Sequence, residues 1–289
     1  MGKGLDVQPR AILVDKPAGP TSHDVVATCR RALGRPRTGH TGTLDPFATG
    51  LLVVLVGRAT RIAPFVSGLD KTYVAGIRLG QRSESGDPEG PITPGGPPPH
   101  EDALRDALAA MVGEIDQRVP ALSAVKVDGE RLYRRTRRGE EVERPTRKVV
   151  VERADLVSYD PMTGDAVVEF RCGSGTYVRQ LAADVGEALG CGAYCRDLRR
   201  TEVGDLRVSA AIAPDEVTPG CGVDPLDVLV HIARVDLDDV AAGDVRHGRP
   251  VPDPSGAGNG PVALASAGSL LAIAESAGGL LRPRVVLAG

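Results

Sequence analysis

The alternation of apolar and polar positions predicts short strands separated by a few helices. An apolar run at 11–14, AILV, ends at a Pro/Gly turn, and the run LLVVLVG at 51–57 is typical of a buried strand. Three further strands are expected, at residues 72–79, where apolar positions alternate, and at residues 149–157 and 166–172. The pattern therefore predicts an α+β fold.

Helical spacing appears in three segments. Ser22 is expected to cap the first helix, whose apolar face holds Val25, Val26, Cys29 and Leu33 and which ends near Gly34. The other two helices are expected at residues 101–112 and at about 178–189.

Two regions lack helical spacing. Residues 83–100 are rich in Pro and Gly and are expected to form a loop. The chain from about residue 231 is expected to be a small β-rich unit, with strand candidates at 262–264 and 270–273.

Composition restricts the class of protein. With 42% hydrophobic and 25% charged residues, the chain is typical of a globular protein, which excludes collagen-like, mucin-like and fully disordered classes. No apolar stretch approaches the roughly 20 residues of a membrane helix, and the N-terminus has no secretory h-region. The five Cys are irregularly spaced, which favours reduced thiols and a cytoplasmic location. No metal is expected at Cys191 and Cys195, because no His or second Cys pair accompanies them.

Positive charge is concentrated in the first half of the chain, although the net charge is −3. Residues 1–150 hold 23 Lys and Arg against 18 Asp and Glu, whereas residues 151–289 hold 12 against 20. Residues 121–148 alone hold nine basic against five acidic residues. This segment suits contacts with nucleic-acid phosphates, but a solvated helix face would have the same composition.

The strongest candidate for chemistry is the segment GHTGTLDP at 39–46. His40 and Asp45 lie on a Gly-bracketed loop before the buried strand, and Pro46 favours an extended backbone at Asp45. A carboxylate held there suits a nucleophile or a general base. A tight turn in which Asp45 caps backbone amides is the alternative.

Six segments together resemble the bacterial tRNA pseudouridine-55 synthases, the TruB-type family. They are VDKPAGPTSHDVV, GHTGTLDPFATGLLVVLVGRATR, DKTYVAGIRLG, VPALSAVKVDGERLYRRTRRG, CGSGTYVRQLAADVGEALG and LRRTEVG, and they occur in the family's order within residues 12 to about 210. The resemblance implies a mixed, largely antiparallel central sheet flanked by helices and loops, plus a small β-rich PUA-like C-terminal domain. The expected domains are residues 1–230 and 231–289.

The resemblance also implies roles for individual residues. Asp45 corresponds to the essential aspartate, Arg179 to the arginine that pairs with it, and Tyr73 to the tyrosine that stacks on the target base. The remaining substrate-binding positions are His40, Tyr177, Leu198, Lys16, and Arg134 and Arg135 in an RNA-clamping insertion at 121–148. Lys16 and Pro17 correspond to a pair that supports the active-site loop. Without the resemblance, Tyr73, Tyr177 and Leu198 would be read as packing residues and Arg179 as a structural ion pair.

The activity that the resemblance implies is isomerisation of uridine to pseudouridine in the T loop of tRNA, with base flipping. The expected partner is the T arm of tRNA, with no cofactor, no membrane, no obligatory protein partner and a monomeric chain. Two alternatives remain: an RNA-binding or tRNA-folding protein with secondary catalysis, and a guide-RNA-dependent pseudouridine synthase. A nucleotide-binding enzyme is disfavoured, because neither GxxxxGK[ST] nor GxGxxG follows a strand.

Overall fold

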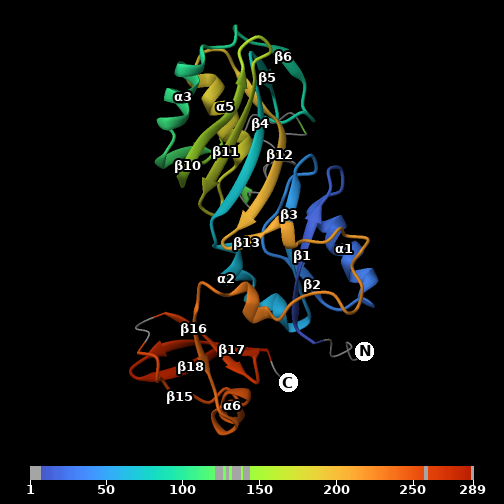
Figure 1. Cartoon of the computed structure of the whole chain (residues 1–289), viewed down its shortest axis with the longest axis vertical. Coiled ribbons are helices and arrows are strands. Elements are labelled where there is room, and N and C mark those ends of the chain that lie inside the picture. The colour runs from blue at the N-terminus through green and yellow to red at the C-terminus, as the bar shows by residue number, and fades with distance from the viewer. Residues whose placement is uncertain are drawn as a thin grey trace. The chain divides into compact units, whose positions relative to one another are not determined.

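The computed structural model describes residues 8–120, 126–127, 130–131, 138, 144–256 and 260–287. The chain divides into two compact units (Figure 1). The first unit contains residues 1–46, 50–69 and 204–289, and the second contains residues 47–49 and 70–203. The predicted α+β class is confirmed, whereas the domain boundary at 230/231 stays a prediction.

The N-terminal part of the first unit packs one helix against antiparallel strands. Strands β1 (Arg10–Lys16) and β2 (Thr38–His40) both pair with β3 (Thr49–Val56). Helix α1 (Ser22–Ala32) buries Val25, Cys29 and Leu33 against apolar side chains of β1 and β3, so the predicted apolar face is confirmed. The short helices η1 (Gly57–Ile62) and α2 (Ala63–Ser67) follow β3.

The cap of α1 is Thr21 rather than the predicted Ser22. The Thr21 side chain accepts a hydrogen bond from the Asp24 backbone N–H, and the Asp24 side chain accepts one from the Thr21 N–H. This reciprocal arrangement is a capping box, and it satisfies two N–H groups at once. The Ser22 hydroxyl is buried and bonds to Leu44 instead.

The C-terminal part of the first unit is a small sheet with one helix. The chain passes through β13 (Leu206–Arg207), η2 (Val208–Ala210) and η3 (Pro225–Val228) before reaching it. The sheet has the order β14-β16-β17-β18-β15, and only β14 and β16 run parallel. Its strands are β14 (Ala233–Asp236), β15 (Val251–Pro252), β16 (Pro261–Ser266), β17 (Ser269–Ala277) and β18 (Leu280–Val286).

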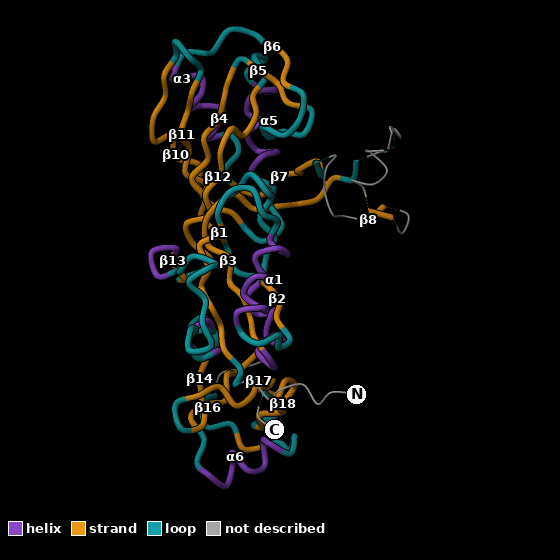
Figure 2. Tube along the Cα trace, turned by 90° about the vertical axis from the view of Figure 1, so that its right-hand side faces the viewer, coloured by secondary structure: helices purple, strands orange, loops and turns teal. Residues whose placement is uncertain are grey.

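Helix α6 (Asp239–Arg246) packs on this sheet through Ala242 and Val245 (Figure 2). The strand candidates at 262–264 and 270–273 lie within β16 and β17. The predicted β-rich C-terminal part is therefore confirmed.

The second unit contains an antiparallel sheet of order β12-β4-β11-β10-β7. Its strands are β4 (Lys71–Leu79), β7 (Gly113–Arg118), β10 (Thr146–Asp160), β11 (Asp165–Cys172) and β12 (Ala193–Val203). Helix α5 (Val178–Ala188) packs on β12 and β4, and α3 (Glu101–Ala109) packs on β10 and α5. A Cβ atom at Gly186 would lie 2.1 Å from the Ala193 nitrogen, so only glycine allows α5 to approach β12 this closely.

Two predictions for the second unit need correction. The segment 83–100 is not entirely loop, because β5 (Gln81–Ser83) pairs with β6 (Ile92–Pro94) as a hairpin. The helix expected at 101–112 ends at Ala109, because the chain turns before β7 starts at Gly113, whose φ is 117°.

Only parts of the predicted insertion at 121–148 are described. Strand β8 (Lys126–Val127) pairs with β9 (Glu130–Arg131), and β10 starts at Thr146. Arg134 and Arg135 lie outside the described residues. Within the described part of the chain, no helix is long and apolar enough to cross a membrane.

Candidate functional site

The loop that carries Asp45 is held in place by backbone hydrogen bonds from both of its sides. The Thr41 N–H donates to the Val53 carbonyl at 3.1 Å. The Ser22 hydroxyl accepts from the Leu44 N–H at 2.8 Å and donates to the Leu44 carbonyl at 2.9 Å, in a buried position. The residue before Asp45 is therefore tied to helix α1 through both of its backbone polar groups.

The residue after Asp45 is tied to a buried ammonium. Lys16 is 0% exposed, and its Nζ donates to the carbonyls of Pro17 at 2.9 Å and Pro46 at 3.1 Å. The Gly19 N–H donates to the same Pro46 carbonyl at 2.9 Å. Hydrogen bonds from a charged donor are stronger than neutral ones, so Lys16 fixes this end of the loop. Asp45 itself lies half-buried between the two tied residues.

His40 begins the same loop and is half-buried. Its Nδ1 accepts a hydrogen bond from the Gly42 N–H at 3.3 Å, which assigns the proton of the neutral ring to Nε2. The His23 ring meets the His40 ring edge to face, with centroids 5.4 Å apart. His23 therefore lies next to the Asp45 loop, and its position in the sequence gave no indication of this.

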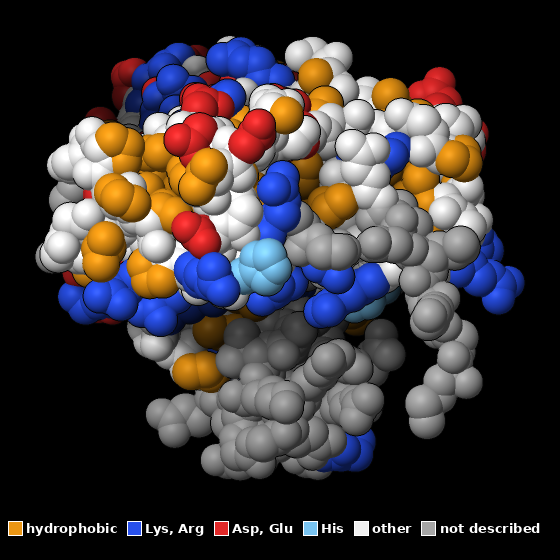
Figure 3. Space-filling model, turned by 90° about the horizontal axis from the view of Figure 1, so that it is seen from below, with side chains coloured by type: hydrophobic (Ala, Val, Ile, Leu, Met, Phe, Trp, Pro, Cys, Tyr) orange, Lys and Arg blue, Asp and Glu red, His pale blue; other side chains and the backbone are white. Residues whose placement is uncertain are grey.

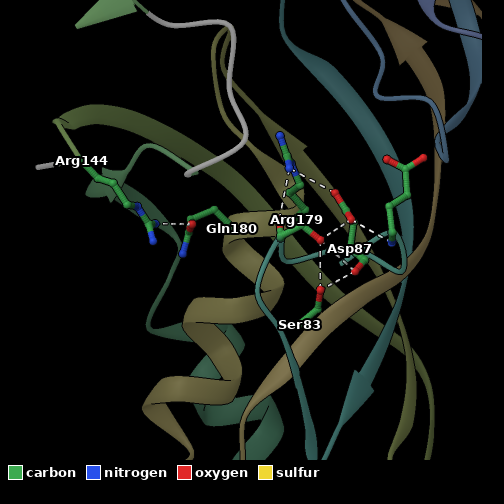
Figure 4. A network of polar contacts seen from close by, with 7 residues as sticks. Ser83, Asp87, Arg144, Arg179 and Gln180 are labelled. Carbon is green, nitrogen blue, oxygen red and sulfur yellow. Dashed lines mark hydrogen bonds and ion pairs between the residues drawn. The ribbon is translucent and has the colours of Figure 1, made fainter. Parts of the chain in front are cut away.

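In the second unit, Arg179 lies in the first turn of α5 and forms a buried ion pair (Figure 4). One of its terminal nitrogens, Nη1, lies 3.1 Å from Oδ2 of Asp87, and both side chains are 4% exposed. The same nitrogen donates to the Ser85 carbonyl at 3.2 Å. Because both side chains are buried and neither charge can reach solvent, the ion pair holds the Arg179 and Asp87 side chains in one orientation.

Asp87 is itself positioned by the turn between β5 and β6. Its Oδ1 accepts from the Ser85 hydroxyl at 2.5 Å and from the Glu89 N–H at 3.1 Å. The Ser83 hydroxyl donates to the Asp87 carbonyl at 2.5 Å. Sequence reasoning missed these residues, and the available signal was an acidic residue in the hydroxyl-rich turn SESGD.

Tyr177 is held through its backbone and its ring. Gln117 of β7 is 0% exposed, accepts from the Tyr177 N–H at 2.9 Å and donates to the Tyr177 carbonyl at 3.0 Å. The guanidinium carbon of Arg147 lies 4.4 Å from the centre of the Tyr177 ring, and that of Arg179 lies 5.8 Å from it. Gln117 was not singled out from the sequence, and Arg147 was considered only as one of the nine basic residues of 121–148.

Tyr73 and Leu198 are both buried, with 7% of each exposed. Tyr73 of β4 is paired in register with Phe170 of β11 and Arg200 of β12, and Leu198 of β12 is paired with Ala75. Nearby on β4, burial lowers the pKa of Lys71 to about 8, and the charge of Arg200 adds to this effect.

The predicted site residues thus form two groups. Asp45, His40 and Lys16 belong to the first unit, and Tyr73, Tyr177, Arg179 and Leu198 belong to the second. The support of the Asp45 loop by Lys16 is observed directly. The pairing of Arg179 with Asp45 stays a prediction, as do the roles of Tyr73 and Leu198.

Comparison with protein families gives two matches. Residues 30–178 match the model of the TruB family pseudouridylate synthase N-terminal domain, and residues 179–219 match the tRNA pseudouridylate synthase B C-terminal domain. The chain is 44% identical to tRNA pseudouridine synthase B of Thermobifida fusca, with 96% of this chain and 98% of that protein covered. It is 42% identical to the protein of the same name from Parasynechococcus marenigrum, with 95% and 96% covered.

Solved structures share the fold. The structure of an H/ACA RNP bound to a substrate RNA containing 2'-deoxyuridine has a chain that is 25% identical, with a TM-score of 0.75 over 97% of this chain and 85% of that chain. A Cbf5–Nop10–Gar1 complex has a chain that is 27% identical, with a TM-score of 0.73 over 96% of this chain and 84% of that chain. The architecture is therefore shared with a chain of an H/ACA RNP and with a chain of a Cbf5–Nop10–Gar1 complex.

Proposed function

Because the chain belongs to the TruB family and is a tRNA pseudouridine synthase, we propose that it converts the uridine at position 55, in the T loop of tRNA, to pseudouridine. The tied loop around Asp45 supports this proposal most directly. Two hydrogen bonds to Ser22 on one side and an ammonium on the other hold a short carboxylate in one place, as a group that acts on a reacting atom requires.

The reaction sets clear demands on the protein. It breaks the N1–C1′ bond of uridine and forms a C5–C1′ bond, with no net redox change, so no cofactor is required. The nucleotide must leave its stack, which costs a few kcal/mol and is easiest in a loop. The detached base must then be turned and reattached without escaping.

We propose that Asp45 acts in its ionised form on the flipped nucleotide. Attack at C1′, addition to C6 of the uracil and removal of the C2′ proton all need this same carboxylate. Tyr73 is proposed to stack on the base, with Tyr177 and Leu198 lining the pocket, while Arg179 favours the charged form of Asp45. His40 is proposed to accompany the flipped nucleotide.

Basic surface residues are proposed to bind the phosphates of the tRNA. Four exposed arginines precede the Asp45 loop, with no acidic residue among them and no ion pair within the described chain: Arg30, Arg31, Arg35 and Arg37. Figure 3 shows groups of Lys and Arg side chains on one face, between apolar side chains. Arg134 and Arg135 are proposed to contribute from the insertion. The enzyme is proposed to be a cytoplasmic monomer that needs no protein partner.

One alternative is supported by a specific observation. The fold resembles that of chains in H/ACA complexes, which favours a guide-RNA-dependent synthase. The two functions differ in what they need, since a stand-alone enzyme converts an unmodified tRNA transcript without other components.

The deciding experiment maps pseudouridine in a tRNA transcript incubated with the purified chain. We expect product at position 55 with the wild type and with the control Asp106→Asn, which changes an exposed residue of α3. We expect Asp45→Asn to bind the tRNA but to lose product by roughly 10³-fold or more. Unchanged turnover of Asp45→Asn would contradict the role of this residue, and an inactive wild type would favour the guide-dependent alternative.

A further inference from the structure

Arg147 and Gln117 lie directly opposite each other on β10 and β7, so their side chains share one face of the sheet. Both contact the same residue at the start of α5. Gln117 bonds to the Tyr177 backbone, and Arg147 lies over the Tyr177 ring. The register of two strands thus fixes both the path and the ring of Tyr177.

The guanidinium of Arg147 lies close to both Tyr177 and Gly175. The Tyr177 ring centre lies 4.4 Å from the guanidinium carbon, and Gly175 lies against the guanidinium as well. A Cβ atom at position 175 would come within 3.4 Å of a terminal nitrogen of Arg147, and the φ of Gly175, +87°, also favours glycine. Nε of Arg147 is buried without a hydrogen-bond partner in the part of the chain that the structure describes, so its terminal N–H groups are the ones left for a planar, bidentate acceptor.

The charge of Arg147 has no counterion within the described chain. The other basic residues of β10 and β11 all have one: Lys148 pairs with Glu114, Arg153 with Asp155 and Glu169, and Arg171 with Glu152. Arg147 is half-buried and makes neither an ion pair nor a hydrogen bond with a described residue. A partly buried cation without an anion is typical of a site that receives one from a ligand.

We propose that Arg147 binds a phosphodiester group of the tRNA, next to the nucleotide that Tyr177 contacts. Phosphate oxygens match the fork of the guanidinium, and phosphate contacts set the register of a protein on its RNA. Gln117 is a positioning residue, because it reaches the RNA only through Tyr177. This inference rests on the proposed function, since it requires a tRNA substrate.

The test compares Arg147→Gln and Arg147→Lys with Arg105→Gln. Arg105 is an exposed residue of α3 that has its own partner, Glu101, so its substitution controls for the loss of one positive charge. Dissociation constants for a tRNA transcript are measured over a series of KCl concentrations. Pseudouridine formation and thermal unfolding are measured for the same proteins.

Arg147→Gln is expected to bind about tenfold more weakly at moderate salt. The slope of its log K against log[KCl] is expected to be less steep than the wild-type slope by about 0.7 to 0.9, which corresponds to one phosphate contact. Arg147→Lys is expected to keep the wild-type slope but to bind several-fold more weakly, because the planar fork is lost. Binding of Arg147→Gln that equals that of Arg105→Gln overturns the proposal. A lower kcat with an unchanged salt slope also overturns it, because that result indicates a purely structural role.

If Arg147→Gln unfolds, Arg147→Lys decides the question alone. Wild-type affinity, or a reduced slope, of the lysine variant overturns the proposal. Failure of the proposed function has a different signature, since the wild type and Arg105→Gln then form no pseudouridine. If the wild type is active and both Arg147 variants bind the tRNA as tightly as the wild type does, the result overturns the phosphate site at Arg147 and leaves the proposed function intact.

Discussion

The Asp45 loop and the Arg179 group position their charged side chains by different means. The Asp45 loop is one continuous segment, and the groups that hold it, Lys16 and Ser22, come from β1 and α1 just before it in the chain. The Arg179 group is assembled from the turn after β5, the facing strands β7 and β10, and the start of α5. The first arrangement is local and the second depends on the packing of the whole unit.

This difference has an energetic counterpart. At the Asp45 loop, the buried Lys16 ammonium donates to the carbonyls of Pro17 and Pro46, and Ser22 makes neutral hydrogen bonds with Leu44. In the Arg179 group, a buried cation faces a buried anion. Removal of one partner of a buried pair leaves an uncompensated charge, which is more costly than removal of a neutral hydrogen bond. The Arg179 group should therefore be the more sensitive of the two to substitution of a supporting residue.

The largest effect among supporting residues is expected for Asp87→Asn. The amide cannot replace the buried ion pair that Asp87 makes with Arg179, so we expect a loss of about 3 to 5 kcal/mol in unfolding free energy and a fall in kcat of roughly 10²-fold. Chemical denaturation and single-turnover product formation measure the two effects. The control is Asp155→Asn, whose side chain is 60% exposed. Wild-type kcat in Asp87→Asn would show that the ion pair is not needed for turnover.

The next largest effect is expected for Lys16→Met, which has a similar length but no donor. The carbonyls of Pro17 and Pro46 lose the hydrogen bonds that the ammonium donates to them, at a cost of roughly 1 to 3 kcal/mol each. We expect kcat to fall about tenfold or more, with little change in tRNA affinity. If affinity falls while kcat is retained, Lys16 acts on RNA binding rather than on the Asp45 loop.

A smaller effect on kcat is expected to distinguish the adjacent hydroxyls of Thr21 and Ser22. Ser22→Ala removes both bonds to Leu44, whereas Thr21→Ala removes only the cap of α1. Each is expected to cost about 1 to 2 kcal/mol of stability, but only Ser22→Ala is expected to lower kcat, by several-fold. Measured at matched temperature below unfolding, equal kcat values for the two variants would contradict the tying of the loop to α1.

The effect with the smallest expected consequence for turnover is a pH dependence of stability that arises from Lys71. Its folded-state pKa of about 8 lies below the ordinary value of 10.5. The unfolded chain therefore binds more protons between these two values, so the contribution of Lys71 to stability rises as the pH increases from about 8 to 10.5. Lys71→Met lacks this titration. The unfolding temperature of the wild type, measured relative to that of Lys71→Met, should therefore rise as the pH increases from about 8 to 10.5. An unchanged pH profile would show that Lys71 does not titrate in this range.

The sequence by itself determined the class of the fold and the Asp45 loop. Alternation identified β4, because a side chain's face in a strand follows directly from its parity. A continuous apolar run identified β3, and short apolar runs identified β16 and β17 of the C-terminal sheet. The Asp45 loop was readable because its residues, 39–46, are contiguous. Lys16 lies 30 positions from Pro46, and only the family resemblance pointed to it. The prediction of the cap of α1 was wrong because Thr21 and Ser22 both carry a hydroxyl that can cap a helix. Only the tertiary structure shows that the Ser22 hydroxyl bonds to Leu44 instead.

Only the tertiary structure decided what surrounds Arg179 and Tyr177. Asp87, Gln117 and Arg147 lie 92, 60 and 30 positions from the residues that they contact. The basic segment 121–148 indicated RNA contacts in general, but nothing in it indicated that Arg147 lies against Tyr177. Their roles depend on strand register and on glycines that allow close packing, such as Gly175 and Gly186. Such properties belong to pairs of distant segments, so no local pattern of residue types carries them.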